Sequence, residues 1–206
     1  DLILIDKVIG VGEVALSDHR SSQPTFDELA RLGGDARRGG LLSGKAGLVD
    51  LHLGDGPRKL DLLLRVLAET ELPASQFLPT HINRNGELFE AGVAYARSGG
   101  FVDLTTSTVP QLLAQGEVKA SSGLARLLRA GGPAERITCT SDGQGSLPDF
   151  DAAGRLVGLS VGRVTSLHEE FRDAVKVDGV GFPEALKVLT SSPADLLKLP
   201  HKGRLA

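Results

Sequence analysis

Five short runs of mostly apolar residues have the pattern of buried strands, at residues 8–16, 48–53, 77–82, 101–105 and 136–141. The segments between and after them show helical apolar spacing or helix start and stop signals. These predicted helices cover residues 26–38, 58–70, 87–98, 121–130, 166–177, 182–190 and 193–199. The glycine-rich stretch 149–164 fits neither pattern, so we expect a long loop over a functional site.

Strands that alternate with helices predict a parallel sheet with helical crossovers. Five strands are too few to close the usual eight-stranded barrel. The pattern therefore leaves two possibilities, an open α/β sheet or a barrel whose first strands lie outside this sequence. No linker divides the 206 residues, so we expect a single domain over 1–206. The chain opens inside an apolar run and ends on what looks like the entry to another strand, so we expect a piece of a longer protein.

Local signals place several helix ends. Thr25 with Glu28, and Ser166 with Glu169, have the spacing of a capping box. The run GGLLSGK at 39–45 matches the GxxxxGK of a phosphate loop, but Ala46 stands where that loop needs a Ser or Thr for magnesium. A helix also precedes this run, so we interpret it as the C-terminal turn of that helix.

Composition narrows the class of protein. Hydrophobic residues make up 41% of the chain and aromatic residues 4%, which allows a sizeable core of mostly Leu, Val and Ala. The net charge of −3 gives no electrostatic reason to expect a nucleic-acid or anionic-membrane partner. No apolar run approaches the roughly 20 residues that span a bilayer. The single cysteine, Cys139, excludes an intrachain disulfide and a CxxC zinc site, and a reducing, cytoplasmic location fits best.

Three potential metal ligands follow or end predicted strands. His52 ends one strand, His81 lies at the end of the next, and Asp142 follows the strand at 136–141. A single strand-end histidine is more often a structural residue than a ligand. The carboxyl ends of parallel strands meet at one face, however, so these three side chains can converge, and imidazole and carboxylate are normal zinc ligands.

Three further residues are candidates for the same face. Glu13 lies in an otherwise apolar strand, where a buried lone carboxylate is costly, so we expect it to pair with a cation or bind a metal. Arg20 and Arg84 follow two strand ends, and arginine binds carboxylates through two hydrogen bonds. Each arginine alone is equally well explained as a loop-fixing residue. His168 and His201 are interpreted as solvated.

Four segments resemble the isoaspartyl dipeptidase family of the amidohydrolase superfamily. They are GEVALSDHRS at 12–21, HLGD at 52–55, PTHINRN at 79–85 and SDGQGS at 141–146. Their order and their gaps are similar to those of the family, and the resemblance spans nearly the whole chain.

The resemblance implies a (β/α)8 TIM barrel, of which this chain would be the part from strand four to strand eight. It implies a centre with two Zn2+ ions and hydrolysis of β-aspartyl dipeptides by a zinc-activated hydroxide. His52 and His81 match two zinc ligands, and Asp142 matches a residue that is both a ligand and the proton shuttle. Arg20, Arg84 and Ser146 match residues that hold the carboxylates of the substrate.

The chain departs from the family pattern in two ways. Glu13 stands where well-known members carry a carboxylated lysine that bridges both metals, and a glutamate can supply the same carboxylate. The family's His-x-His pair is absent, because the histidines here are at positions 19, 52, 81, 168 and 201. The family's small β-domain is absent as well.

We therefore expect a zinc-dependent isoaspartyl dipeptidase whose substrate is a small dipeptide. The alternatives are another amidohydrolase, such as a dihydroorotase-like enzyme or an N-acyl amino acid hydrolase, and an inactive truncated fragment. In a truncated fragment, an open arc of five strands would leave two sheet edges unpaired, which invites aggregation or association. For the enzyme we expect a homo-oligomer.

Overall fold

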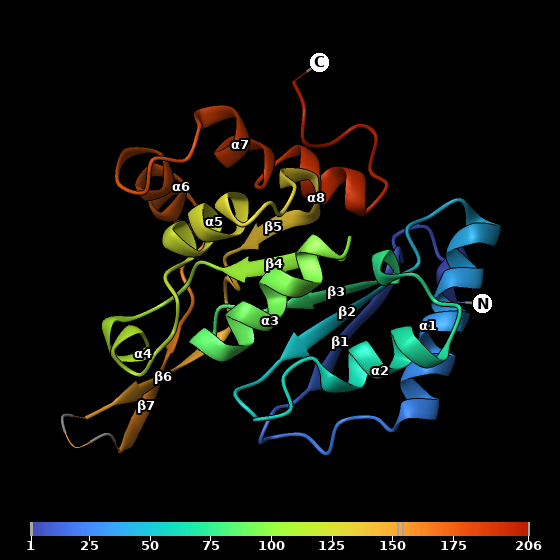
Figure 1. Cartoon of the computed structure of the whole chain (residues 1–206), viewed down its shortest axis with the longest axis horizontal. Helices are drawn as coiled ribbons and strands as arrows, with labels where there is room; N and C mark the ends of the chain where they lie inside the picture. The colour runs from blue at the N-terminus through green and yellow to red at the C-terminus, as the bar shows by residue number, and fades with distance from the viewer. Residues whose placement is uncertain (1, 152, 154, 206) are drawn as a thin grey trace.

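The computed structural model describes residues 2–151, 153 and 155–205, and it contains an α/β fold (Figure 1). The strands are β1 (Gly10–Leu16), β2 (Leu48–Leu53), β3 (Phe77–Thr80), β4 (Val102–Thr105), β5 (Ile137–Thr140), β6 (Ser146–Phe150) and β7 (Leu156–Val161). The helices are α1 (Phe26–Ser43), α2 (Asp61–Glu69), α3 (Gly86–Arg97), α4 (Pro110–Ala114), α5 (Ala120–Arg129), α6 (Ser166–Lys176), α7 (Phe182–Lys187) and α8 (Ser191–Leu196). Short 3₁₀ turns occupy Leu2–Leu4, Ala74–Gln76 and Ala134–Arg136.

Strands β1 to β5 lie side by side in chain order. β1, β2 and β3 form one parallel sheet, and β4 pairs in parallel with β5. The two sheets meet where the amide of Ile82, just after β3, donates to the carbonyl of Asp103 on β4 at 3.3 Å. The parallel α/β arrangement predicted from the alternation of strands and helices is confirmed. The carboxyl ends of all five strands therefore open toward one side of the fold (Figure 1).

The two faces of these strands differ in chemistry, because alternate side chains of a strand point to opposite faces. On β2, Val49, Leu51 and Leu53 are fully buried in the hydrophobic core. Asp50 and His52 occupy the other face. The same alternation on β4 and β5 separates the core residues from Asp103, Thr105, Thr138 and Thr140. The strands thus carry an apolar face against the helices and a polar face that leads toward their carboxyl ends.

Helix α1 begins as the sequence predicts and continues to Ser43, five residues beyond the predicted end at 38. The Thr25 hydroxyl accepts the amide of Glu28 and the Glu28 carboxylate accepts the amide of Thr25, which completes the predicted capping box. At the other end Gly44 takes a left-handed conformation with φ of 72°, so the GGLLSGK run is the helix C-terminal turn that we predicted. The Lys45 ammonium donates to three backbone carbonyls of the N-terminal segment, those of Ile3, Ile5 and Val8.

Two predictions at the level of elements are wrong, and one short helix was missed. We expected a loop over 149–164, but β6 (Ser146–Phe150) and β7 (Leu156–Val161) pair there as an antiparallel hairpin. Ser166 begins α6 but does not form a capping box, because its hydroxyl bonds the carbonyl of Arg163 and the hydroxyl of Thr106. The five-residue helix α4 was not predicted, since it is too short to show a helical period.

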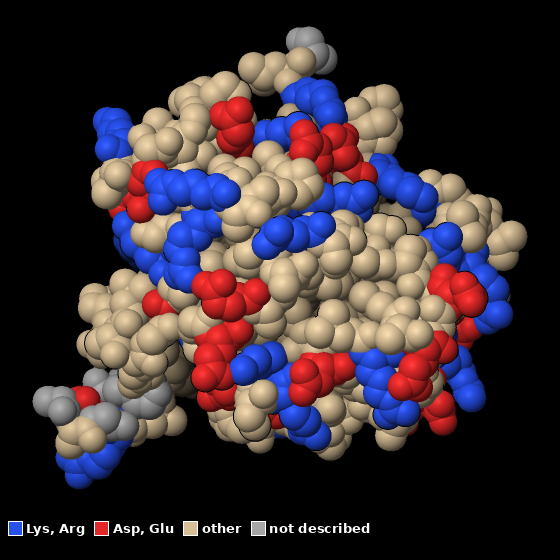
Figure 2. Space-filling view, viewed as in Figure 1, with Lys and Arg blue, Asp and Glu red and all other residues tan. Residues whose placement is uncertain are grey.

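The surface carries charges of both signs. Lys and Arg side chains are interspersed with Asp and Glu over the face drawn in Figure 2. No helix in the described ranges is long and apolar enough to cross a membrane. His168 and His201 are exposed, as predicted.

Candidate metal centre

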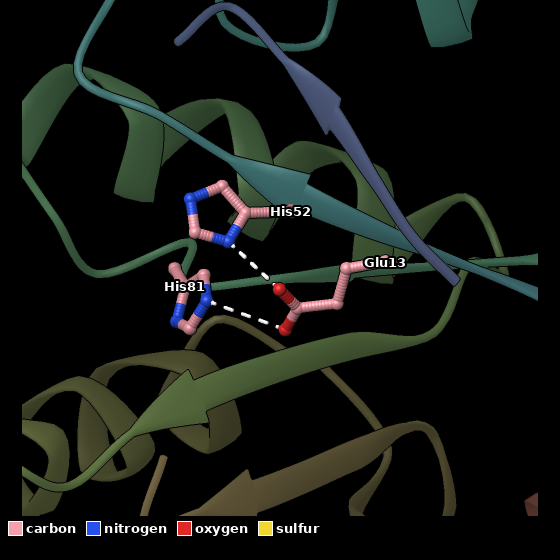
Figure 3. Close-up of side chains that lie close together, drawn as sticks. All are labelled: Glu13, His52 and His81. Atoms are coloured by element: carbon pink, nitrogen blue, oxygen red, sulfur yellow. Dashed lines mark hydrogen bonds and ion pairs between the residues drawn. The ribbon is translucent and has the colours of Figure 1, made fainter. Parts of the chain in front are cut away.

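Three side chains from three adjacent strands converge at the carboxyl end of the sheet (Figure 3). Glu13 projects from a bulge in β1, where the pairing with β2 shifts register between Val11 and Val14. His52 is the second-last residue of β2, and His81 follows β3 directly. Bulges commonly redirect a side chain beside a functional site, and here the bulge carries Glu13 toward the two histidines.

The contacts within this group are short. His52 Nδ1 lies 3.0 Å from Glu13 Oε2, and His81 Nε2 lies 3.7 Å from Glu13 Oε1. The two imidazole rings meet edge to face, with their centroids 4.5 Å apart. One ligand atom from each of the three residues lies within 4.8 Å of the other two. Glu13, His52 and His81 therefore form a candidate metal-binding group.

Glu13 is more exposed than its apolar neighbours in sequence suggest. Its side chain is 46% exposed, so the expectation of a buried carboxylate is wrong. The hydrogen bond with His52, followed by the close approach of the His81 imidazole, holds the pKa of the Glu13 carboxyl well below its usual range. The carboxylate is thus ionised and directed at two imidazoles, which is the protonation state that a metal ligand requires.

The donor set fits a divalent metal. His81 is only 2% exposed, and its Nε2 has no hydrogen-bond partner among the described residues. An unpaired buried nitrogen is costly unless something else bonds to it. Two imidazole nitrogens and a carboxylate are ligands typical of zinc in hydrolases, and a metal between Glu13 and His81 would satisfy the unpaired atom.

Asp18 is a member of the site that we did not assign from the sequence. It is buried, and its Oδ2 lies 3.1 Å from His52 Nε2. Arg20 donates to both oxygens of Asp18, through Nε at 2.9 Å and through a terminal nitrogen at 2.6 Å. The Arg20 guanidinium holds the pKa of Asp18 well below its usual range. One of the two predicted carboxylate-binding arginines is therefore already paired with a carboxylate of this chain.

Arg84 also approaches His52 Nε2, the nitrogen that Asp18 contacts. One of its terminal nitrogens is 3.3 Å from His52 Nε2, while its buried Nε has no partner in the described part of the chain. Burial, followed by the nearby charge of Arg20, lowers the pKa of the Arg84 guanidinium from its ordinary value. Unlike Arg20, Arg84 forms no ion pair with a carboxylate among the described residues.

A single cleft of about 1170 Å³ brings most of the predicted site residues together. It is lined by Arg20, His52, His81, Arg84, Asp142 and Ser146, among others. Glu13 lies beside it through its contacts with the two histidines. The polar face of the strands thus opens into a space large enough for a small ligand.

Asp142 lies in this cleft but outside the group formed by Glu13 and the two histidines. It follows β5 in a left-handed conformation with φ of 48°, and its carbonyl accepts the amide of Gly145 in a tight turn. That turn leads into β6, whose first residue is Ser146. Its role as a metal ligand stays a prediction.

No protein-family model matches the chain. Solved structures do match it over its whole length. One is the β-aspartyl dipeptidase of the thermophilic, keratin-degrading Fervidobacterium islandicum AW-1, in complex with the β-Asp-Leu dipeptide, with 43% sequence identity and a TM-score of 0.87. A second structure of β-aspartyl dipeptidase from the same organism matches with 39% identity and a TM-score of 0.83.

The chain resembles β-aspartyl dipeptidases along its entire length. The two matches cover 100% of this chain, and they confirm the resemblance that the four sequence motifs predicted. The chain spans about half of each β-aspartyl dipeptidase, 53% of one and 50% of the other.

More distant structures share the fold alone. The organophosphorus hydrolase of Deinococcus radiodurans has 16% identity and a TM-score of 0.57, over 89% of this chain and 54% of its own. The N-acetylglucosamine-6-phosphate deacetylase of Pasteurella multocida has 14% identity and a TM-score of 0.54, over 90% of this chain and 48% of its own.

Proposed function

We propose that this chain is the C-terminal part of the catalytic domain of a zinc-dependent β-aspartyl (isoaspartyl) dipeptidase. The observation that carries the proposal is the convergence of Glu13, His52 and His81 in a chain that matches such an enzyme over its full length at 43% identity. The substrate would be a small β-aspartyl dipeptide, the kind of ligand named for that relative.

The proposal includes the architecture of the intact enzyme. We infer that β1 to β5 are the fourth to eighth strands of a TIM barrel. Their adjacency in chain order, their helix-covered apolar face and their polar opposite face all support this inference. A barrel places its active site at the carboxyl ends of its strands, which is where the cleft opens in this chain.

His52 Nδ1, His81 Nε2 and the Glu13 carboxylate would hold the metal, with Asp142, which lines the same cleft, as a further ligand. A complete site would hold two zinc ions, with Glu13 as the bridge between them. Bound zinc would activate the attacking water and polarise the amide carbonyl of the substrate. The convergence of the three side chains, with ligand atoms within 4.8 Å of one another, supports this assignment.

Residues of the cleft would handle the proton and the substrate. Asp142 would accept the proton of the attacking water and return it to the nitrogen of the leaving amine, as a general acid and base. Arg84 would bind a carboxylate of the dipeptide through its guanidinium, and the Ser146 hydroxyl would add a hydrogen bond; both residues line the cleft. Holding the dipeptide in one orientation lowers the entropic part of the barrier.

Arg20 is proposed for the same task, but it would work differently. Two nitrogens of its guanidinium already donate to the Asp18 carboxylate, so an incoming carboxylate would share the guanidinium with Asp18. We therefore expect Arg84 to contribute more to substrate binding than Arg20 does.

A comparison of substrates tests the proposal. Because we propose that the chain belongs to a larger barrel, the assay uses the full-length protein that contains it, loaded with zinc. Hydrolysis of β-Asp-Leu, α-Asp-Leu and dihydroorotate would be measured under the same conditions. We expect a clear preference for β-Asp-Leu.

A preference for α-Asp-Leu or dihydroorotate would replace the proposal with another amidohydrolase activity. If zinc-loaded protein hydrolysed none of the three substrates, the alternative of an inactive protein would be favoured.

A further inference from the structure

The ring of His81 can bind a metal only if the correct nitrogen faces Glu13. An uncharged imidazole carries a proton on one nitrogen and a lone pair on the other, and the hydrogen bond at one nitrogen decides the state of the other. In this structure Nε2 faces Glu13, and it is buried without a hydrogen-bond partner among the described residues. Whatever bonds to Nδ1 therefore controls this ligand.

Thr105 is that partner. Its hydroxyl, at the end of β4, forms a short hydrogen bond with His81 Nδ1, and both residues are buried. With the proton on Nδ1 donated to this hydroxyl, the lone pair of Nε2 points toward Glu13. The neutral hydroxyl also adds no charge beside the metal, unlike Asp18, which faces the outer nitrogen of His52.

Asn83 holds Thr105 in place. Its side chain accepts the amide of Thr105 at 2.8 Å and donates to the carbonyl of the same residue at 3.0 Å. It donates a further hydrogen bond to the carbonyl of Val118 at 2.9 Å. Asn83 is fully buried, so these bonds are shielded from water. The amide and the carbonyl of Thr105 are thus both held by the Asn83 side chain.

The same arrangement supports an uncommon backbone conformation. His81 has φ of 62°, in the left-handed region that few residues other than glycine adopt. The segment is kept in place by the bond from Ile82 to Asp103 and by the bonds between Asn83 and Thr105. Conformations of this kind persist where the surroundings over-determine them, and they concentrate at functional sites.

A buried carboxylate ties β4 to its two neighbours directly below this point. Asp103 is fully buried and accepts hydrogen bonds from the hydroxyls of Thr80 on β3 and of Thr138 and Thr140 on β5. These bonds fix the three strands relative to one another, two residues before Thr105. The three strands beneath His81 are therefore held together by these hydrogen bonds.

We propose that Thr105, clamped by Asn83, is a positioning residue that fixes the orientation of the metal ligand His81 and accepts its Nδ1 proton when Nε2 binds the metal. The inference rests on the metal site of the proposed function. It assigns to Thr105 a role in metal affinity that does not require contact with the substrate. Outer partners of metal-binding histidines typically contribute about 10–100-fold to metal affinity.

Zinc affinity of three threonine variants tests this inference. Competition with a chromogenic chelator would be used on the full-length protein that contains the chain. Thr105→Val keeps the shape of the side chain and removes the hydroxyl, whereas Thr105→Ser keeps the hydroxyl. Thr70→Val is the matched control, because the Thr70 hydroxyl bonds only the carbonyl of Val66 and the amide of Leu72, at the end of α2.

We expect Thr105→Val to bind zinc about 10–100-fold more weakly than the wild type. Thr105→Ser should restore most of the affinity, and Thr70→Val should leave it unchanged. Wild-type affinity in folded Thr105→Val would overturn the inference, with the metal site itself intact. Failure of the wild-type protein to bind zinc would overturn both this inference and the proposed metal site.

A second measurement needs no variant and stays decisive if Thr105→Val fails to fold. Nitrogen-15 NMR of the histidine rings in the zinc-loaded wild-type protein reports which nitrogen carries the metal. We expect His81 to bind zinc through Nε2 and to keep a proton on Nδ1. Zinc on Nδ1 of His81, or a His81 ring without zinc, would contradict the assignment.

Discussion

At the scale of single residues, the two histidines of the candidate site present different nitrogens to Glu13. His52 uses Nδ1 and His81 uses Nε2. The remaining nitrogen of each ring is held by a different kind of partner, the Asp18 carboxylate for His52 and the Thr105 hydroxyl for His81. Each ring is therefore held by a hydrogen bond at the nitrogen that faces away from Glu13. This favours a preformed site over one that assembles around the metal.

The first prediction concerns His81 as a ligand. His81→Ala should weaken zinc binding by more than about 100-fold, because it removes a donor atom where outer partners alone contribute about 10–100-fold. His168→Ala is the matched control, since His168 is exposed on α6. Equilibrium dialysis with metal analysis measures both. Equal zinc content in the two variants would show that His81 is not a ligand.

The residues of the site were predictable from sequence only in part. His52, His81 and Glu13 could be found because they end or interrupt apolar runs. Asp18 could not, because its role depends on a turn that brings it onto His52, 34 positions away in the chain. Asp103 did carry a signal, a carboxylate inside a buried strand, and it is the same signal that drew attention to Glu13.

At the scale of elements, the alternation of strands and helices carried the prediction of the fold. The predicted strand at 48–53 is β2 itself, and its parallel pairing followed from the crossovers. The hairpin of β6 and β7 was not predicted, because its glycines and Pro148 obscure the two-residue period of a strand. The pattern of apolar residues therefore identified the buried strands and did not identify the exposed hairpin.

The bulge in β1 gives the second prediction. A β-carbon on Gly12 would lie 2.5 Å from the β-carbon of Asp50, so Gly12→Ala must push β1 away from β2. We expect a loss of about 1–3 kcal/mol in the free energy of unfolding, together with weaker zinc binding as Glu13 moves. Gly34→Ala, on α1, is the control, since nothing lies within 4 Å of its added carbon.

Urea denaturation and zinc titration measure the two effects. Gly34→Ala should stabilise the protein by about 0.5–1 kcal/mol, because alanine suits a helix interior better than glycine. A Gly12→Ala variant as stable as the wild type, with unchanged zinc affinity, would contradict the role of the bulge.

The contact between α5 and α6 gives a prediction about pH. Burial raises the pKa of Glu170, whose carboxylate accepts the amide of Ser121. A raised pKa means that the folded state holds this proton at pH values where the unfolded chain has released it. The Glu170 contribution to stability should therefore fall as pH rises above the unfolded value of about 4.3.

The Glu170→Gln variant isolates this effect. Its stability relative to the wild type should improve steadily between pH 4 and neutral pH, as measured by urea denaturation at each pH. A difference between variant and wild type that does not change with pH would contradict the raised pKa.

At the scale of the whole molecule, the proposed barrel requires strands that this sequence does not contain. Within the described ranges, the outer sides of β1 and β5 pair with no further strand. We predict that the natural protein has a subunit mass well above the 21.6 kDa of these 206 residues. Intact-mass spectrometry of protein purified from its source measures this. A mass near 21.6 kDa would contradict the barrel and would predict no turnover.

We propose that one metal is held by Glu13 within β1, by His52 near the end of β2 and by His81 directly after β3. Anomalous X-ray diffraction at the zinc edge, on crystals of the zinc-loaded protein, tests it most directly. We expect a zinc peak about 2.0–2.2 Å from His52 Nδ1, from His81 Nε2 and from a Glu13 oxygen. A zinc peak elsewhere, or a fully loaded protein with none between these three side chains, would contradict it.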